Sequence, residues 1–276
     1  GDGHGHDDLL GGADGTVRRV YARGIGCAHG AGRAGFPNHP GCGGRSVAPV
    51  PDLAYGEAMA IVYRAELTPG KQEIVTAWLA RQPWSGVDDG DSVEMIGAYR
   101  FDDPDERIGI ETHLVRRSDG TVLQVPLTYR GAELSGAEEH LAGEMEHSVL
   151  GHRWIYDATG DPVYAAALAR PLVRGQAGAD QFRDIDGTLV LQPSTVVVHG
   201  FGDHAAPAPD ITRAAPSTSE EPGAGHVTTI TTDGPALAVY RTPHAASGHD
   251  GHDGRDGQLT GRWDGLGDSL LLAALT

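Results

Sequence analysis

In the middle of the chain, apolar residues first recur every three or four positions, as in a helix, and then at every second position, as in strands. The helix is predicted from four apolar residues three or four positions apart, namely Ile74, Val75, Trp78 and Leu79. Thr68 is predicted to cap this helix, and Pro69 suits the first helical position, where no N–H is needed. Pro83 is predicted to end it.

Three strands are predicted next, over residues 93–101, 107–116 and 121–130, because side chains of one kind alternate there. The residues expected to share one face are Ile108, Ile110 and Leu114 in the second strand, and Leu123, Val125, Leu127 and Tyr129 in the third. A hairpin turn at 118–120 joins these two strands. Pro126 cannot donate to a strand ladder, so its strand is predicted to be an edge or bulged there, and a partner could dock on that edge.

A fourth strand, over 148–157, precedes a second helix that Asp161 is predicted to cap, with Pro162 at its first position. Further strands are predicted over residues 188–199, 227–232, 236–242, 258–263 and 269–272. Two long polar segments, 200–225 and 244–257, are predicted to be mobile loops. This order of elements predicts an α+β fold.

The N-terminal segment differs from the rest in composition. Residues 1–58 are Gly-rich and show no sustained period, which predicts disorder. Met59 stands directly before the first patterned stretch, and one hypothesis is that it is the natural start and that 1–58 is upstream, non-native sequence. The predicted parts are therefore 1–58, a first folded part over 59–175 and a β-rich part over 176–276.

The formal net charge is −17, and the excess lies after residue 58. Nucleic acid and anionic lipid would be repelled, so both are predicted to be poor partners. No apolar run approaches the roughly 18 to 20 residues of a membrane span, and we expect a cytoplasmic protein without a membrane partner. Two cysteines are too few for a disulfide framework.

Three motifs follow one another in the central segment. They are Trp78-Leu79 with Gln82-Pro83-Trp84, then VPLTYR at 125–130, and then HSVLG at 147–151 with RWIYD at 153–157. This pattern resembles the maltokinase N-terminal cap-like family over about residues 61–172. The resemblance implies a cystatin-like cap, in which a curved antiparallel sheet packs on a helix, followed here by a β-rich second half.

The same resemblance implies a role in maltose, trehalose or α-glucan (glycogen) metabolism, because complete maltokinases transfer phosphate from ATP to maltose. The family also includes short, stand-alone proteins of actinobacterial type, and the resemblance implies such a stand-alone member without the catalytic lobe. Phosphoryl transfer needs a Lys, an Asp and an Asn in defined roles, but the chain has one Lys, Lys71, and one Asn, Asn38, and no Walker A loop. No catalytic residue and no cofactor are therefore predicted.

The favoured hypothesis is a non-catalytic accessory or regulatory module whose protein partner is a sugar kinase or an α-glucan enzyme. Two alternatives stay open. One is an enzyme, either a divergent maltokinase-like phosphotransferase or another α-glucan-active catalyst. The other is an oligosaccharide-binding module, because sugar rings stack on aromatic side chains.

Several residues are candidates for binding. Possible sugar or partner contacts are Trp84, Tyr129, Arg130, Trp154, Tyr156 and Trp263, although core packing is the favoured interpretation for each aromatic residue. A weak zinc pattern is formed by Cys27, His29, His39 and Cys42. A second His/Asp group, in the loop around His244, is predicted to be solvated rather than metal-binding. His147 and His152 should point to opposite faces of a strand, with one packed and one exposed.

Overall fold

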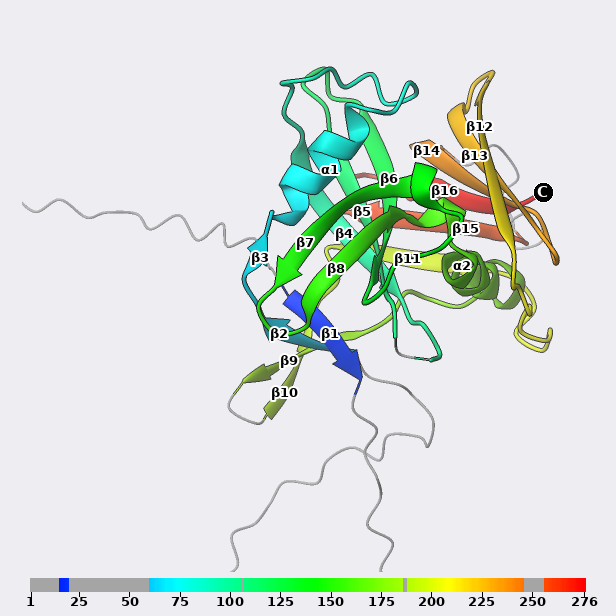
Figure 1. Cartoon of the computed structure of the whole chain (residues 1–276). Coiled ribbons are helices and arrows are strands. Elements are labelled where there is room, and N and C mark those ends of the chain that lie inside the picture. Colours follow the sequence, from blue (N-terminus) through cyan, green and yellow to red (C-terminus); the bar gives the residue numbers. More distant parts are fainter. Residues whose placement is uncertain (1–14, 20–59, 106, 186–187, 246–255) are drawn as a thin grey trace, which may run out of the picture.

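The computed structural model describes residues 15–19, 60–105, 107–185, 188–245 and 256–276. The strands of this described part form three sheets (Figure 1). The smallest sheet has the strand order β1-β2-β9-β10. Its strands are β1 (Gly15–Arg19), β2 (Ala60–Arg64), β9 (Gln181–Ile185) and β10 (Thr188–Gln192).

Strand β1 corrects one expectation, because no element was predicted before residue 59. It pairs antiparallel with β2 over five residue pairs. Backbone hydrogen bonds alone can add a strand to a sheet edge, so a strand of this kind leaves little hydrophobic pattern in the sequence. The rest of 1–59, with Met59 and the four zinc candidates, lies outside the described residues.

The first large sheet has the order β3-β7-β8-β6-β5-β4, with antiparallel neighbours throughout. Its strands are β3 (Leu67–Thr68), β4 (Glu94–Phe101), β5 (Gly109–Arg116), β6 (Val122–Arg130), β7 (Leu141–His147) and β8 (Gly151–Asp157). The sheet curves around helix α1 (Lys71–Leu79) (Figure 1). The sequence pattern did not predict β7, and β8 begins three residues later than expected.

Helix α1 buries the four predicted residues of its apolar face, but its predicted start is wrong. Thr68 ends strand β3, where it pairs with Glu146, so it is not available as a helix cap. The N-cap is Gly70, whose backbone N–H donates to the Glu73 carboxylate at 2.8 Å. That bond satisfies a backbone group that the helix itself leaves unpaired.

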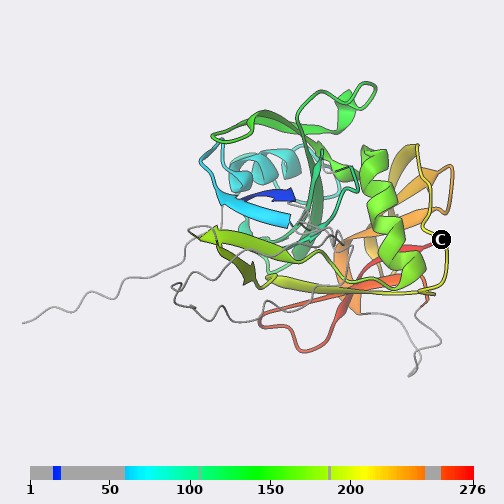
Figure 2. The same ribbon diagram turned by 90° about the horizontal axis from the view of Figure 1, so that it is seen from below.

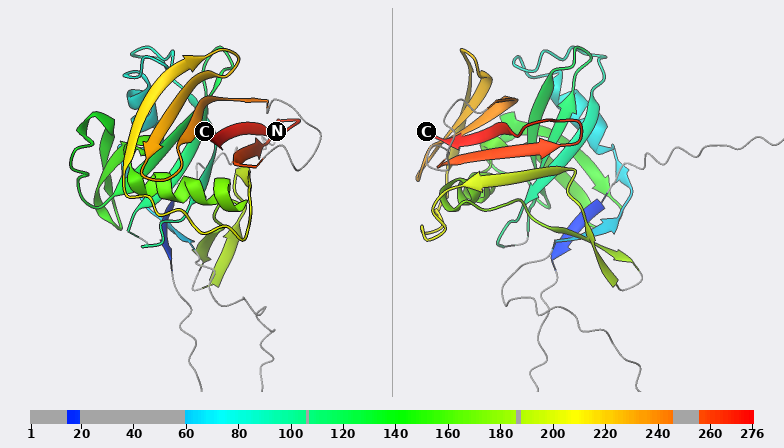
Figure 3. Two further views of the ribbon diagram at one scale, coloured as in Figure 1. Left: turned by 90° about the vertical axis from the view of Figure 1, so that its right-hand side faces the viewer. Right: turned by 180° about the vertical axis from the view of Figure 1, so that it is seen from behind.

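The second large sheet has the order β11-β15-β16-β14-β13-β12 and is also antiparallel. Its strands are β11 (Val196–Phe201), β12 (Ala214–Glu221), β13 (Gly225–Thr232), β14 (Leu237–Ala245), β15 (Gln258–Trp263) and β16 (Leu270–Leu275). Figure 3 shows the β12–β13 hairpin, in yellow and orange, rising at one edge of this sheet. Two short 3-10 turns, η1 (Glu138–His140) and η2 (Ala158–Gly160), lie between β6 and α2 (Pro162–Arg174).

Two expectations for this half need correction. The stretch predicted as one strand over 188–199 is divided into β10 and β11. The segment 200–225, predicted as a loop, contains β12, which pairs with β13 along its whole length. Strand β12 is mostly exposed and polar, so it lacks the apolar alternation by which strands are predicted.

Helix α2 starts as predicted. The Asp161 side chain accepts a hydrogen bond from the backbone N–H of Val163, and Pro162 occupies the first turn. Gly175 follows the helix with a positive φ of 63°, a conformation that glycine adopts without strain. The helix packs on β11, β15 and β16, while α1 lies on the other side of the first sheet (Figure 2).

Strand β5 is buried on both faces, and it separates two hydrophobic clusters. Ile110 and Leu114 face the cluster shared with α2 and the second large sheet, and Ile108 packs against it, as predicted. Val115 faces the cluster around α1, together with the predicted face of β6. The division of the chain near residue 175 stays a prediction, and the first of these clusters contains residues from both sides of it.

Pro126 lies at a place where the ladder between β6 and β8 has not yet begun, since these strands pair only from Leu127 to Arg130. Strand β6 is nevertheless an inner strand between β5 and β8, and Pro126 is buried. The expectation of an open edge for partner docking at this position is therefore wrong. The fold class itself, a curved antiparallel sheet on a helix followed by a β-rich half, is confirmed.

Candidate ligand-binding cavity

A cavity of about 460 Å³ lies between the end of α1 and the second large sheet. Trp78, Gln82 and Trp84 line it from α1 and the loop that follows. Across from them, Glu220 of β12 and Arg241 of β14 complete the wall. A volume of this size falls in the range of about 300–1,000 Å³ that is typical of small-molecule sites.

Arg241 is the most unusual residue of this cavity, because it is 2% exposed and charged. Its Nε donates to Thr228 Oγ1 at 2.7 Å, and its Nη2 donates to Asp157 Oδ2 at 2.8 Å and to Thr159 Oγ1 at 3.2 Å. The guanidinium carbon lies 4.6 Å from the ring centroid of Trp84. Within the described residues, Nη1 has no hydrogen-bond partner.

The rim of the cavity is acidic and polar. Glu139 of η1 has a side chain that is 82% exposed, and Glu220 is also exposed. His140 and His226 line the same space. The cavity therefore combines indole walls, hydrogen-bond acceptors at its mouth and two buried donors, Arg241 Nη1 and Trp78 Nε1, that have no acceptor among the described residues.

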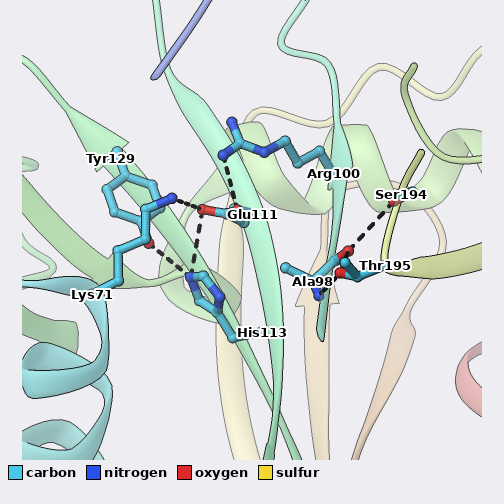
Figure 4. Close-up of polar contacts among 8 residues, drawn as sticks. All are labelled: Lys71, Ala98, Arg100, Glu111, His113, Tyr129, Ser194 and Thr195. Atoms are coloured by element: carbon cyan, nitrogen blue, oxygen red, sulfur yellow. Dashed lines mark hydrogen bonds and ion pairs between the residues drawn. The ribbon is translucent and has the colours of Figure 1, made fainter. Parts of the chain in front are cut away.

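A second polar cluster lies under the start of α1, on the concave face of the first sheet (Figure 4). Glu111 of β5 is at its centre: Lys71 Nζ lies 2.8 Å from Oε2, and Arg100 Nη2 lies 2.9 Å from Oε1. His113 Nε2 lies 2.9 Å from the Tyr129 hydroxyl and 3.5 Å from Glu111 Oε2. The side chains of Lys71, Arg100, Glu111 and His113 are at most 12% exposed.

The environment of this cluster fixes the charge states of its members. Burial raises the pKa of Glu111, but the nearby Arg100 and Lys71 outweigh burial and hold that pKa well below its usual range. Burial, reinforced by Lys71 and Arg100, lowers the pKa of His113 to about 4 despite the neighbouring Glu111 carboxylate. A neutral His113 next to an ionised, doubly paired carboxylate is an arrangement typical of structural ion-pair networks.

The predicted contact residues are divided between several places. Trp84 reaches the cavity, whereas Tyr129 belongs to the polar cluster. Arg130 binds the Asp161 carboxylate through Nε and Nη2, both at 2.7 Å. Trp154, which is partly exposed, pairs with Arg130 across the ladder between β8 and β6, so these two residues do come together.

Tyr156 and Trp263 are packed in the protein, at 3% and 7% exposure. The Tyr156 hydroxyl accepts a hydrogen bond from the backbone N–H of Leu134, and Trp263 belongs to the cluster around α2. His147 is buried at the end of β7, whereas His152 lies on β8 between the carboxylates of two glutamates of β7 and its side chain is 36% exposed. One histidine is packed and the other is partly exposed, as predicted, but the expectation that both lie on one strand is wrong.

Arg241 and the cavity that it lines were not predicted from the sequence. The available signal was a single Arg inside the apolar strand predicted over 236–242, where a charged residue should be costly unless it is paired. Its partner Asp157 is 84 positions away, so no local pattern joins them. Among the described residues, no three His, Cys, Asp or Glu side chains come together in the manner of metal ligands.

The described residues thus form an α+β protein whose curved antiparallel sheet encloses a helix. Residues 78–161 match the family model of the maltokinase N-terminal cap domain, the family that the sequence motifs resemble. A search of curated proteins finds no significant match to the chain. No described helix combines the length and the apolar character that crossing a membrane requires.

The matched segment contains only one side of the cavity. Trp78, Trp84 and Asp157 lie within it, whereas Glu220 and Arg241 come from the second large sheet, outside the match. The cavity therefore depends on both halves of the described chain.

Proposed function

We propose that this protein is a non-catalytic accessory or regulatory module of maltose, trehalose or α-glucan metabolism. It acts by contact with a sugar kinase or another α-glucan enzyme, and it does so in the cytoplasm. The match to a maltokinase cap domain supports the carbohydrate context. The net charge of −17 argues against nucleic acid as a partner.

The observation that carries the non-catalytic part of this proposal is the position of Lys71. It is the one lysine of the sequence, and kinase-like phosphoryl transfer uses a lysine to hold nucleotide phosphates. Here its ammonium group is held by Glu111 at 2.8 Å, and its side chain is 12% exposed. Engaging a nucleotide would require breaking this buried ion pair.

The first experiment incubates the full chain with ATP, magnesium and either maltose or glucosamine. We expect no sugar phosphate. If sugar phosphate does form, Lys71→Ala tests the argument directly, with Arg116→Ala as a matched control that removes an exposed cation. Product formation by the unaltered chain would contradict the non-catalytic assignment, whatever the variants do.

The second experiment tests the partner. The full chain is used as bait in its native cell extract, and a recovered sugar kinase or α-glucan enzyme is then purified and assayed with and without it. We expect a change in the kcat or KM of that enzyme. A purified enzyme that neither binds the chain nor changes its kinetics would contradict the proposal.

A further inference from the structure

The cavity contains a hydrogen-bond donor that the described fold does not satisfy. Arg241 Nη1 is buried and has no acceptor, although the other two guanidinium nitrogens make three hydrogen bonds to protein oxygens. Buried polar groups are almost always paired, and exceptions call for an explanation. An oxygen atom of a bound molecule would supply the missing acceptor.

The charges around this donor restrict what can bind. Asp157 already neutralises Arg241 at 2.8 Å, so a second anion would be repelled by Asp157 and by the carboxylates of Glu139 and Glu220. A cation that stacked on the indole of Trp84 would be repelled by the Arg241 guanidinium, whose carbon lies 4.6 Å from the centroid of that ring. Both kinds of charged ligand are therefore disfavoured at the inner end.

A neutral hydroxyl group meets both requirements, because it accepts one hydrogen bond and donates another. In a ligand with several hydroxyl groups, one can accept from Arg241 Nη1 while others donate to the carboxylates at the rim. The walls formed by Trp78, Pro83 and Trp84 offer apolar surface to C–H groups. Alternating hydroxyl and C–H groups are the chemical signature of a sugar.

We infer that this cavity binds a neutral, polyhydroxylated ligand, of the class of glucose or a short oligosaccharide. This inference goes beyond the proposed function, since a module could bind a partner enzyme without holding any small molecule. It also makes both halves of the described chain part of one binding site, because Arg241 and Glu220 come from the second large sheet and the tryptophans from α1 and the loop that follows it.

The test measures binding to the purified full chain by saturation-transfer NMR and by calorimetry. The probes are glucose, maltose and maltotriose at millimolar concentration, with inorganic phosphate as an anionic probe and choline as a cationic probe. We expect transfer to at least one sugar and none to phosphate or choline. Because no partner enzyme is present, the outcome is independent of the proposed regulatory role.

The location is tested with two neighbouring glutamates of β12. Glu220 lines the cavity, whereas Glu221 does not, and both are exposed. Glu220→Ala should weaken sugar binding about tenfold, as expected for a lost hydrogen bond to a charged group, and Glu221→Ala should leave it unchanged. Arg241→Lys removes Nη1 and should also weaken binding, provided that circular dichroism shows a folded protein.

Three outcomes would overturn the inference. The first is no transfer and no heat with any of the sugars. The second is stronger binding of phosphate or choline than of sugar. The third is sugar binding that responds equally to Glu220→Ala and Glu221→Ala, which would place the ligand elsewhere.

Discussion

Asp157→Ala is expected to be one of the most destabilising single changes in this protein. The substitution removes the carboxylate that pairs with Arg241, and both side chains of this pair are at most 3% exposed. Arg241 would keep Thr228 and Thr159 as partners but would lose its counter-charge inside the protein. A buried charge without compensation is far more costly than a missing surface contact.

The magnitude follows from the bonds that disappear. Loss of one partner of a buried ion pair costs about 3–5 kcal/mol. The Asp157 carboxylate also accepts hydrogen bonds from the backbone N–H and the hydroxyl of Thr159, at 3.0 and 2.7 Å, so we expect the upper part of that range. Domains are stable by only about 5–15 kcal/mol, and the variant should therefore be partly unfolded at moderate urea concentrations.

The assay is urea denaturation followed by circular dichroism, with Glu94→Ala as the control. Glu94 and Arg116 form an ion pair of similar length, 2.7 Å, but their side chains are 64% and 40% exposed. The control should change the free energy of unfolding by at most about 1 kcal/mol. If Asp157→Ala lowers the free energy of unfolding no more than the control does, the argument that burial makes this ion pair important would be refuted.

Two further predictions concern acidity and close packing. The pKa of His113 is about 4 in the folded protein and about 6.5 in an unfolded chain, so the unfolded state binds more protons between these values. The free energy of unfolding should therefore fall as the pH falls from about 6.5 to 4, and His113 should contribute about 1.4 kcal/mol per pH unit to this fall. Urea titrations should show a smaller pH dependence in His113→Phe than in the unaltered protein. An unchanged pH dependence in that variant would contradict the burial argument. Gly200→Ala should lower the free energy of unfolding by about 1–3 kcal/mol, because its Cβ would overlap the backbone carbonyl of Pro171. Gly267→Ala, with nothing within 4 Å of the added Cβ, should be close to neutral in thermal melts.

Local patterns predicted the parts of the fold that local physics controls. The apolar face of α1, the Asp161 cap of α2 and the two faces of the β5–β6 pair were all visible in short stretches of sequence. Each of these features depends on residues only a few positions apart. That is why spacing and capping rules succeed for them.

Features that depend on distant contacts were missed. Thr68 is a good helix cap by type, but pairing with Glu146 places it in a strand. Strand β12 carries no apolar alternation, because it contributes little to the core and owes its conformation to the neighbouring β13. The cavity was hidden for the same reason, since its tryptophans and Arg241 are separated by more than 150 positions.

Gln124 of β6 has a consequence for how the two large sheets are held. Its fully buried amide nitrogen donates to the carbonyl oxygens of Tyr240 and Leu272, and its amide oxygen accepts from the hydroxyl of Tyr99. Two apolar surfaces alone could shift relative to each other at a small cost in free energy. A shift here would leave the Gln124 amide and the carbonyl groups of Tyr240 and Leu272 without hydrogen bonds and away from water. The hydrogen bonds of this one amide therefore favour a single relative position of the two large sheets.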